Sequence, residues 1–198
     1  MPKDFVLSVM SRDRPGIVAG LTEAVTELDG NIDAISQTVL QGYFTIILTV
    51  CFDESVEPAA LMAAVKESAA PGELEVSVKE HRVLQPEPAM QDADRFVLTI
   101  HGADRKGIIR RVSSYLSSRN VNIEDLYAYV HDGQFLLIAQ LQVPHRLAVE
   151  HLRTDMEALW PEEQMRVSLQ HEDVFLATSH VDFRQRVPKA PRNGRPSR

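Results

Sequence analysis

The chain has 198 residues, of which 44% are hydrophobic and 25% are charged, a composition typical of globular proteins with one or two domains. It contains no run of 18 apolar residues and no signal-peptide pattern at its start, so we expect no membrane span and a cytoplasmic location. Residues 1–182 carry 28 acidic and 15 basic side chains, and such an acidic body argues against direct binding of nucleic acid phosphates.

The first half of the chain alternates between strand-like and helix-like blocks in the order βαββαβ. Pro15 suits the first turn of a helix, Asp13 precedes it where a cap is useful, and Gly30 follows the helix as a stop. The predicted elements are a strand over 5–10, a helix ending near Leu28, strands over 32–41 and 43–52, a helix from Pro58 and a strand over 74–82.

The second half shows the same order, followed by one more short helix. In that last helix, Val174, Phe175 and Thr178 should face the body of the protein. The predicted elements are a strand over 95–102, a helix over 106–119, strands over 122–131 and 134–143, a helix over 146–159, a strand over 165–171 and a short helix over 172–180.

A shift of 91 residues aligns the chain with itself without a gap, so the two halves are copies of one module. The order βαββαβ predicts an α+β fold: two ferredoxin-like modules in tandem, each an antiparallel four-stranded sheet with its helices on one face. Because the strands are apolar on both sides, we expect the other face to be covered by sheet stacking or dimerisation. Identical pairs include Asp13/Asp104, Gly16/Gly107, Asn31/Asn122, Gly42/Gly133 and Phe44/Phe135.

These patterns divide the chain into four parts. The first domain covers 1–83, a linker containing Pro86 and Pro88 covers 84–94, and the second domain with its short helix covers 95–180. Residues 181–198 form a basic tail that we expect to be disordered, because its six Lys and Arg residues lie among Pro, Gly, Asn and Ser. The tail is either a solvated end or a docking arm for an acidic partner.

The loop Asp13-Arg14-Pro15-Gly16-Ile17-Val18, followed by Gly30-Asn31-Ile32, resembles the signature of the ACT domain family. The run 35–45 resembles stand-alone bacterial and archaeal ACT proteins of about ninety residues. The tandem layout is similar to that of the glycine cleavage system transcriptional repressors, and the resemblance covers roughly 4–180. The second copy departs from the signature at Lys106, where the first copy has proline, and at Gly102-Ala103, which replaces Ser11-Arg12.

This resemblance implies a non-enzymatic regulatory protein that binds a small amino acid near the first loop of paired modules. Glycine or serine is the implied ligand, with a branched-chain amino acid as competitor, and a homodimer acting on a protein partner such as a transcriptional activator is the implied assembly. A helix N-terminus suits a carboxylate, and an aspartate suits an ammonium group. The implied ligand-binding residues are Ser11, Asp13, Arg14, Pro15, Gly16, Ile17 and Asn31 in the first copy, and Asp104, Arg105, Gly107, Ile108 and Asn122 in the second.

Purely structural roles are the alternative for these residues. Asp13 would cap the helix, Arg14 would form a surface ion pair, and Gly16 and Asn31 would serve their turns. Two other functions also stay open: a regulatory subunit acting in trans on an enzyme of amino acid metabolism, and an interaction scaffold without a ligand.

No pattern in the sequence indicates an active site. The seven histidines lack metal-ligand spacing, phosphate-binding and nucleophile motifs are missing, and Cys51 reads as a small buried side chain, so we predict no catalytic residues, metal or cofactor. A DNA-reading helix would need an exposed basic face. The best candidate, 106–119 with Arg110, Arg111 and Arg119, packs on the predicted core, so any control of transcription should act through a DNA-binding activator.

Overall fold

The computed structural model describes residues 3–53, 56–81, 92–160 and 165–179. The chain forms two compact units, one within 1–84 and one within 85–183, and we refer to their described parts as the first module (3–81) and the second module (92–179). Most of the predicted linker and the whole predicted tail, 181–198, lie outside the described residues. The second module begins with a strand at Ala93, inside the range 84–94 that was predicted as linker.

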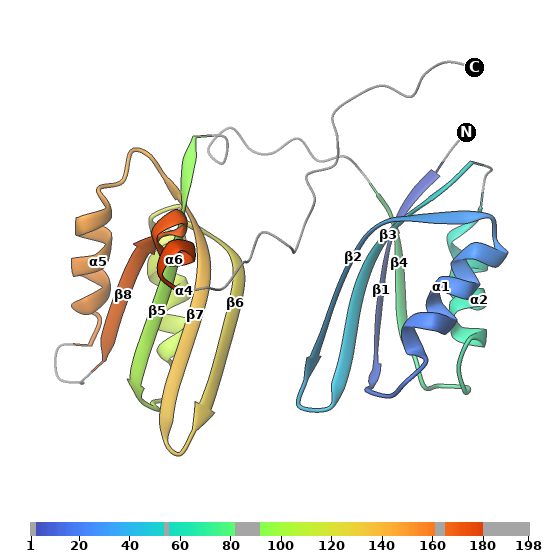
Figure 1. Cartoon of the computed structure of the whole chain (residues 1–198), viewed down its shortest axis with the longest axis horizontal. Coiled ribbons are helices and arrows are strands. Elements are labelled where there is room, and N and C mark those ends of the chain that lie inside the picture. Colours follow the sequence, from blue (N-terminus) through green and yellow to red (C-terminus); the bar gives the residue numbers. More distant parts are fainter. Residues whose placement is uncertain (1–2, 54–55, 82–91, 161–164, 180–198) are drawn as a thin grey trace. The chain divides into compact units, whose positions relative to one another are not determined.

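The first module has the predicted βαββαβ order (Figure 1). Its strands are hydrogen-bonded in the order β2-β3-β1-β4, with every neighbour antiparallel. This arrangement is the ferredoxin-like sheet that the sequence predicts. The elements are β1 (Lys3–Arg12), α1 (Ile17–Glu27), β2 (Gly30–Leu40), β3 (Tyr43–Phe52), α2 (Pro58–Glu67) and β4 (Glu75–Glu80).

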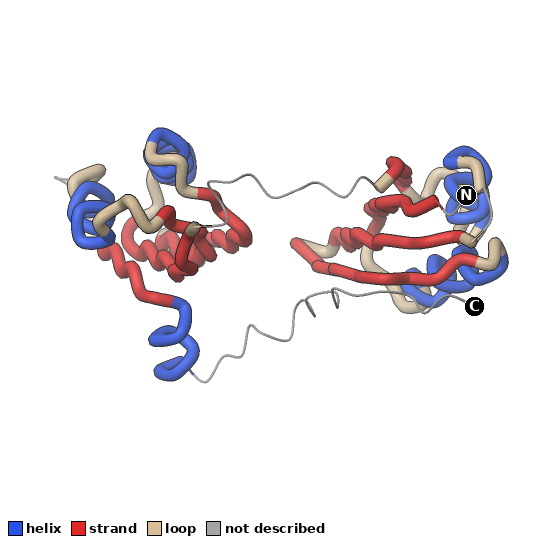
Figure 2. The backbone as a smooth tube through the Cα atoms, turned by 90° about the horizontal axis from the view of Figure 1, so that it is seen from above, coloured by secondary structure: helices blue, strands red, loops and turns tan. Residues whose placement is uncertain are grey.

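The second module repeats the sheet in the order β6-β7-β5-β8 and adds a last helix, α6 (Glu172–Ser179). Figure 2 shows α6 on the opposite side of this sheet from the other two helices. It contacts β5 and β8, where Val97 is only 2% exposed although it faces away from the main core. The other elements are β5 (Ala93–Ala103), α4 (Ile108–Ser118), β6 (Asn122–His131), β7 (Gln134–Pro144), α5 (Val149–Glu157) and β8 (Arg166–His171).

The short helix packs differently from the sequence prediction. Phe175 and Leu176 are half-buried, whereas Val174 and Thr178 are exposed, and the Thr178 hydroxyl donates to the Val174 carbonyl oxygen at 2.9 Å. The prediction that Val174 and Thr178 face the body is therefore wrong. None of the described helices is both long and apolar enough to cross a membrane.

Each core lies between one face of the sheet and the paired helices. In β1, Phe5, Leu7 and Val9 are buried while their neighbours Val6 and Ser8 are half-buried, which is the two-residue alternation of a strand with one covered face. The face without helices keeps large apolar side chains exposed in the first module, namely Met10, Leu40, Tyr43 and Ile47. The covering of this face by stacking or dimerisation stays an expectation.

Both first helices begin at a left-handed glycine rather than at the predicted residues. Gly16 and Gly107 are the N-cap residues, with φ of 93° and 87°, a conformation that only glycine adopts readily. Pro15 therefore precedes the helix instead of opening it, and α4 starts at Ile108 rather than at 106. Asp13 does not cap α1, because neither N-cap receives a side-chain hydrogen bond.

The residue that turns the chain after α1 is Asp29, not the predicted Gly30. Asp29 has φ of 56°, as does its counterpart Asn120 after α4. Gly30 is the first residue of β2 and leaves room for the ring of Phe52, since a Cβ there would lie 2.9 Å from Phe52 Cζ. The prediction of a glycine stop is thus wrong, and the glycine serves close packing instead.

Candidate ligand-binding loops

The two β–α loops are anchored to their sheets in the same way. In the first module the Asp13 N–H donates to the Gly42 carbonyl oxygen at 2.9 Å, and in the second the Asp104 N–H donates to the Gly133 carbonyl oxygen at 2.9 Å. Both acceptors lie at the tips of the hairpins β2–β3 and β6–β7, where the glycines have positive φ. Each loop is therefore hydrogen-bonded to the hairpin beside it. Sequence reasoning missed this link, although both glycines repeat at a spacing of 91.

Each loop leads into a helix N-terminus that no side chain caps. The Gly16 carbonyl oxygen accepts the Gly20 N–H at 3.0 Å, and the Gly107 carbonyl oxygen accepts the Arg111 N–H at 3.0 Å, so the helical ladder starts at the glycines. The first N–H groups of a helix lack partners within the helix, and the positive end of the helix dipole lies there. The arrangement can receive a carboxylate.

The two candidate isoleucines, Ile17 and Ile108, could contact a ligand only through their backbone groups. Ile17 is 4% and Ile108 is 3% exposed, and both side chains belong to the cores. Ser11 is 6% exposed on the helix side of β1, where its hydroxyl donates to the Arg12 carbonyl oxygen at 3.1 Å. Its counterpart Gly102 has no side chain, so the first module has a buried hydroxyl at the strand end before its loop and the second module does not.

Arg14 pairs with Glu73, which precedes β4, and also donates to the Pro15 carbonyl oxygen at 3.1 Å. The other Glu73 carboxylate oxygen accepts the Ala70 N–H at 3.1 Å. The hydrogen bond between the two side chains lowers the pKa of Glu73 and raises that of Arg14. The surface ion pair that the sequence left as an alternative for Arg14 is therefore present, and Glu73 is a residue that sequence reasoning did not single out.

The second loop lacks this neutralising pair within the part of the chain that is described. Arg105 corresponds to Arg14, but the position that corresponds to Glu73 is Gln164, which lies outside the described residues. Asp13 and Asp104 are both exposed, so each loop presents a carboxylate to solvent.

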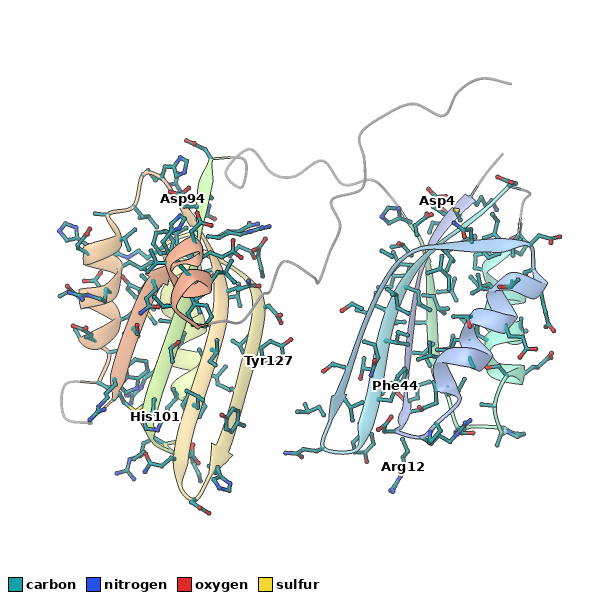
Figure 3. All side chains as sticks on the ribbon, viewed as in Figure 1. Asp4, Arg12, Phe44, Asp94, His101 and Tyr127 are labelled. Carbon is teal, nitrogen blue, oxygen red and sulfur yellow. The ribbon has the colours of Figure 1, made fainter. Side chains whose placement is uncertain are left out.

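The two candidate asparagines lie at the other end of each sheet. Asn31 pairs with Cys51, which pairs with Asp4 at the start of β1, whereas the loop follows Arg12 at the end of β1. Figure 3 labels Asp4 and Arg12 at these two ends. Eight residues of extended strand span roughly 27 Å, so a single module does not bring its asparagine to its loop. Asn122, opposite Gln142, is placed in the same way.

Cys51 is half-buried, and its thiol lies 3.5 Å from the Asp33 carboxylate. Burial and the nearby Asp33 charge raise the thiol pKa, which disfavours a reactive thiolate at neutral pH. Asn31 donates to the same Asp33 oxygen at 3.5 Å, at the limit of a hydrogen bond. Among the described residues, no group of three or more His, Cys, Asp or Glu side chains could hold a metal ion.

A family model described as "ACT domain" matches residues 3–79 and 94–170, one match in each module. A UPF0237 protein of Methanosarcina acetivorans is 34% identical over 87 residues, which is 42% of this chain and 91% of that protein. A UPF0237 protein of Methanopyrus kandleri is 35% identical over 88 residues, which is 44% of this chain and 98% of that protein. These relatives are thus about as long as one module.

Two solved structures match this chain over most of its length. A protein described as unknown from Galdieria sulphuraria has a TM-score of 0.71 at 21% identity, covering 86% of this chain and 99% of that chain. A putative glycine cleavage system transcriptional repressor has a TM-score of 0.59 at 15% identity, covering 87% of this chain and 99% of that chain. At such identities the likeness shows the fold alone.

Proposed function

Since this chain is a tandem member of the ACT domain family and belongs with the UPF0237 proteins, we propose that it is a non-enzymatic regulatory protein that binds a small amino acid and acts on a partner protein. One observation carries the proposal: both modules place an uncapped helix N-terminus next to an exposed aspartate on a loop tied to a hairpin tip. Because both modules keep this whole arrangement, we infer that the loops have a functional role in addition to a structural one.

The chemistry of this arrangement suits a zwitterion. The first N–H groups of α1 or α4 would bind the ligand carboxylate, and the carboxylate of Asp13 or Asp104 would bind its ammonium group. Arg14 is already paired with Glu73, so it would shape the first loop rather than bind the ligand directly. A small side chain such as that of glycine or serine fits the proposal best, because the ligand must approach the backbone at Gly16 or Gly107.

The response would be a shift between conformations of the loop and its hairpin. A ligand that binds one loop conformation more tightly stabilises it, and a coupling of ~1–3 kcal/mol is enough for a useful switch. Through Gly42 the first loop is connected to β2, an edge strand with Ile35, Val39 and Leu40 exposed. Exposed edges with apolar side chains are common places for pairing with a second copy or a partner.

A role like that of a glycine cleavage system repressor is the finer form of this proposal. It is supported by the tandem layout, which extends over nearly the whole of the similar solved structure of that description. Control of an enzyme in trans is the alternative, and a scaffold without a ligand is the third. In the repressor-like role the chain would contact a DNA-binding activator rather than DNA.

The test is a thermal-shift screen of the full chain against the twenty amino acids, followed by calorimetric titration of any hit. A ligand at a hundred times its dissociation constant stabilises the protein by ~2.7 kcal/mol, which gives a clear shift. Asp13→Asn and Asp104→Asn, singly and together, should weaken the response, whereas Glu67→Gln and Glu150→Gln, exposed carboxylates on α2 and α5, should not. A flat screen, or a hit that the aspartate variants leave unchanged, would refute the proposed site.

A further inference from the structure

The start of α4 carries a cluster of positive charge that the same place in the first module does not. Arg105 and Lys106 precede Gly107, and Arg110 and Arg111 follow in the first turn of the helix. All four side chains are exposed. The corresponding residues of the first module are Arg14, Pro15, Ala19 and Gly20, and Arg14 is neutralised by Glu73.

This placement opposes the electrostatics of the helix. The N-terminus of a helix is the positive end of its dipole, so cations there are unfavourable and acids are preferred. A sequence that breaks such a local rule without compensation usually does so at a functional surface. Within the described residues, Lys106 and Arg110 form no ion pair, whereas Arg119 at the end of the same helix pairs with Asp155 at 2.9 Å.

Two acidic residues of the described chain belong to the same loop and to the hairpin bonded to it. Asp104 lies in the same loop, and Asp132 lies in the adjacent hairpin turn, where it is 3.3 Å from His131. An exposed apolar side chain lies beside these cations in the sequence, since Ile109 directly precedes Arg110 in the first turn of α4 and is 45% exposed.

We infer that the exposed surface at the start of α4, formed by Lys106 before the helix and by Ile109 and Arg110 in its first turn, is a docking surface for an acidic segment of a partner protein. The cations would bind its carboxylates, and Ile109 would be covered by an apolar side chain of the same segment. An apolar centre with a charged rim is the usual design of a protein interface. The inference rests on the proposed function for the existence of a partner protein.

The size and surroundings of the surface favour a protein segment over nucleic acid. Lys106 lies just before the N-cap Gly107 and Arg110 lies in the first turn of α4, so their Cα atoms are at most roughly 14 Å apart, within the reach of a short peptide. The body of the chain, 1–182, has 28 acidic and 15 basic residues, and such a surplus repels a long phosphate backbone. An exposed isoleucine adds nothing to phosphate binding.

The experiment measures binding of three fluorescent probes to the full chain by anisotropy in 50 mM and 150 mM NaCl. The probes are a twelve-residue peptide of Glu and Leu, a peptide of the same charge containing Glu and Ser, and a single-stranded oligonucleotide of the same charge. We expect the Glu/Leu peptide to bind most tightly. Lys106→Glu/Arg110→Glu should weaken it at least tenfold, and Ile109→Ser should reduce its advantage over the Glu/Ser peptide.

Arg146→Glu/Arg153→Glu is the matched control, because it makes the same change in net charge at exposed positions away from the start of α4. Equal weakening in this control would overturn the inference, since net charge alone would explain binding. Preferential binding of the oligonucleotide, or no binding of the peptides in 50 mM NaCl, would also overturn it. The peptides are tested without amino acids, so a failed amino acid screen and a failed docking surface are distinguishable.

Discussion

Replacement of Gly30 by alanine should destabilise the first module selectively. A Cβ at this position would lie 2.9 Å from Phe52 Cζ and 2.9 Å from Val25 Cγ1, well inside ordinary contact. The ring cannot easily move away, because Phe52 is buried and packs edge-on against Phe5 with the ring centroids 5.9 Å apart. Overpacking of this kind costs about 1–3 kcal/mol.

The second module indicates how the clash is relieved. Val121 and Val143 occupy the positions of Gly30 and Phe52, so one copy uses a small and a large residue where the other uses two of medium size. Phe52→Val alone should cost roughly 2–4 kcal/mol through the cavity that it leaves. The double variant Gly30→Ala/Phe52→Val should lose less stability than the two single variants together, by about 1–3 kcal/mol, because the added methyl group fills part of that cavity.

Urea unfolding of the full chain measures these changes, and the position of the single tryptophan makes the two modules distinguishable. Trp160 is buried in the core of the second module, so its fluorescence reports on that module, whereas circular dichroism reports on both. Gly30→Ala should move the dichroism transition to lower urea and leave the fluorescence transition in place. Losses that simply add in the double variant would refute the packing argument.

Three further changes should affect the second module. Gly107→Ala forces a side chain into φ of 87° and should lower its stability by about 1–2 kcal/mol in urea unfolding followed by Trp fluorescence. The hydrogen bonds that the His145 ring donates to the carboxylates of Asp94 and Asp92, with that to Asp94 the larger cause, raise the pKa of His145. The stabilisation that protonated His145 contributes should therefore be complete below about pH 6.5 and disappear as pH rises through the pKa of His145 in the folded protein. Asp94→Asn should lower that pKa, as measured by NMR titration of the histidine, and so reduce the pH dependence of stability. Burial, with the hydrogen bond to Asp155 at 2.7 Å, raises the pKa of Tyr115, so Asp155→Ala should lower that pKa in an absorbance titration and cost about 1–2 kcal/mol.

The fold was predictable because its signals are periodic and repeated. The alternation of Phe5, Leu7 and Val9 identifies a strand with one buried face, and the same rhythm 91 residues later confirms the order of elements. The start of α1 was not predictable from local rules. Asp13 and Pro15 both satisfy those rules, but the Asp13 N–H is bonded to Gly42 in a hairpin almost thirty residues away, and the helix starts at Ile17, after the left-handed Gly16.

The candidate site was predictable in part for the same reason. Its glycines and aspartates repeat in the sequence, whereas the ion pair of Arg14 with Glu73 joins residues 59 apart without a local pattern. The separation of Asn31 from the loop could have been derived in advance. A helix that returns along the sheet places the start of the next strand at the far end, so the order of elements already excludes contact within one module.

The two modules share a backbone but not the electrostatics of their loops. The first loop has a buried hydroxyl from Ser11 beneath it and an arginine neutralised by Glu73, so a zwitterion would meet balanced charge and additional polar contact there. The second loop lacks the hydroxyl and gains the exposed charges of Lys106 and Arg110. These differences favour recognition of the amino acid by the first module and of an acidic partner by the second. On this argument Asp13→Asn should reduce the amino acid response more than Asp104→Asn does, and equal effects of the two variants in the calorimetric titration would contradict the division of roles.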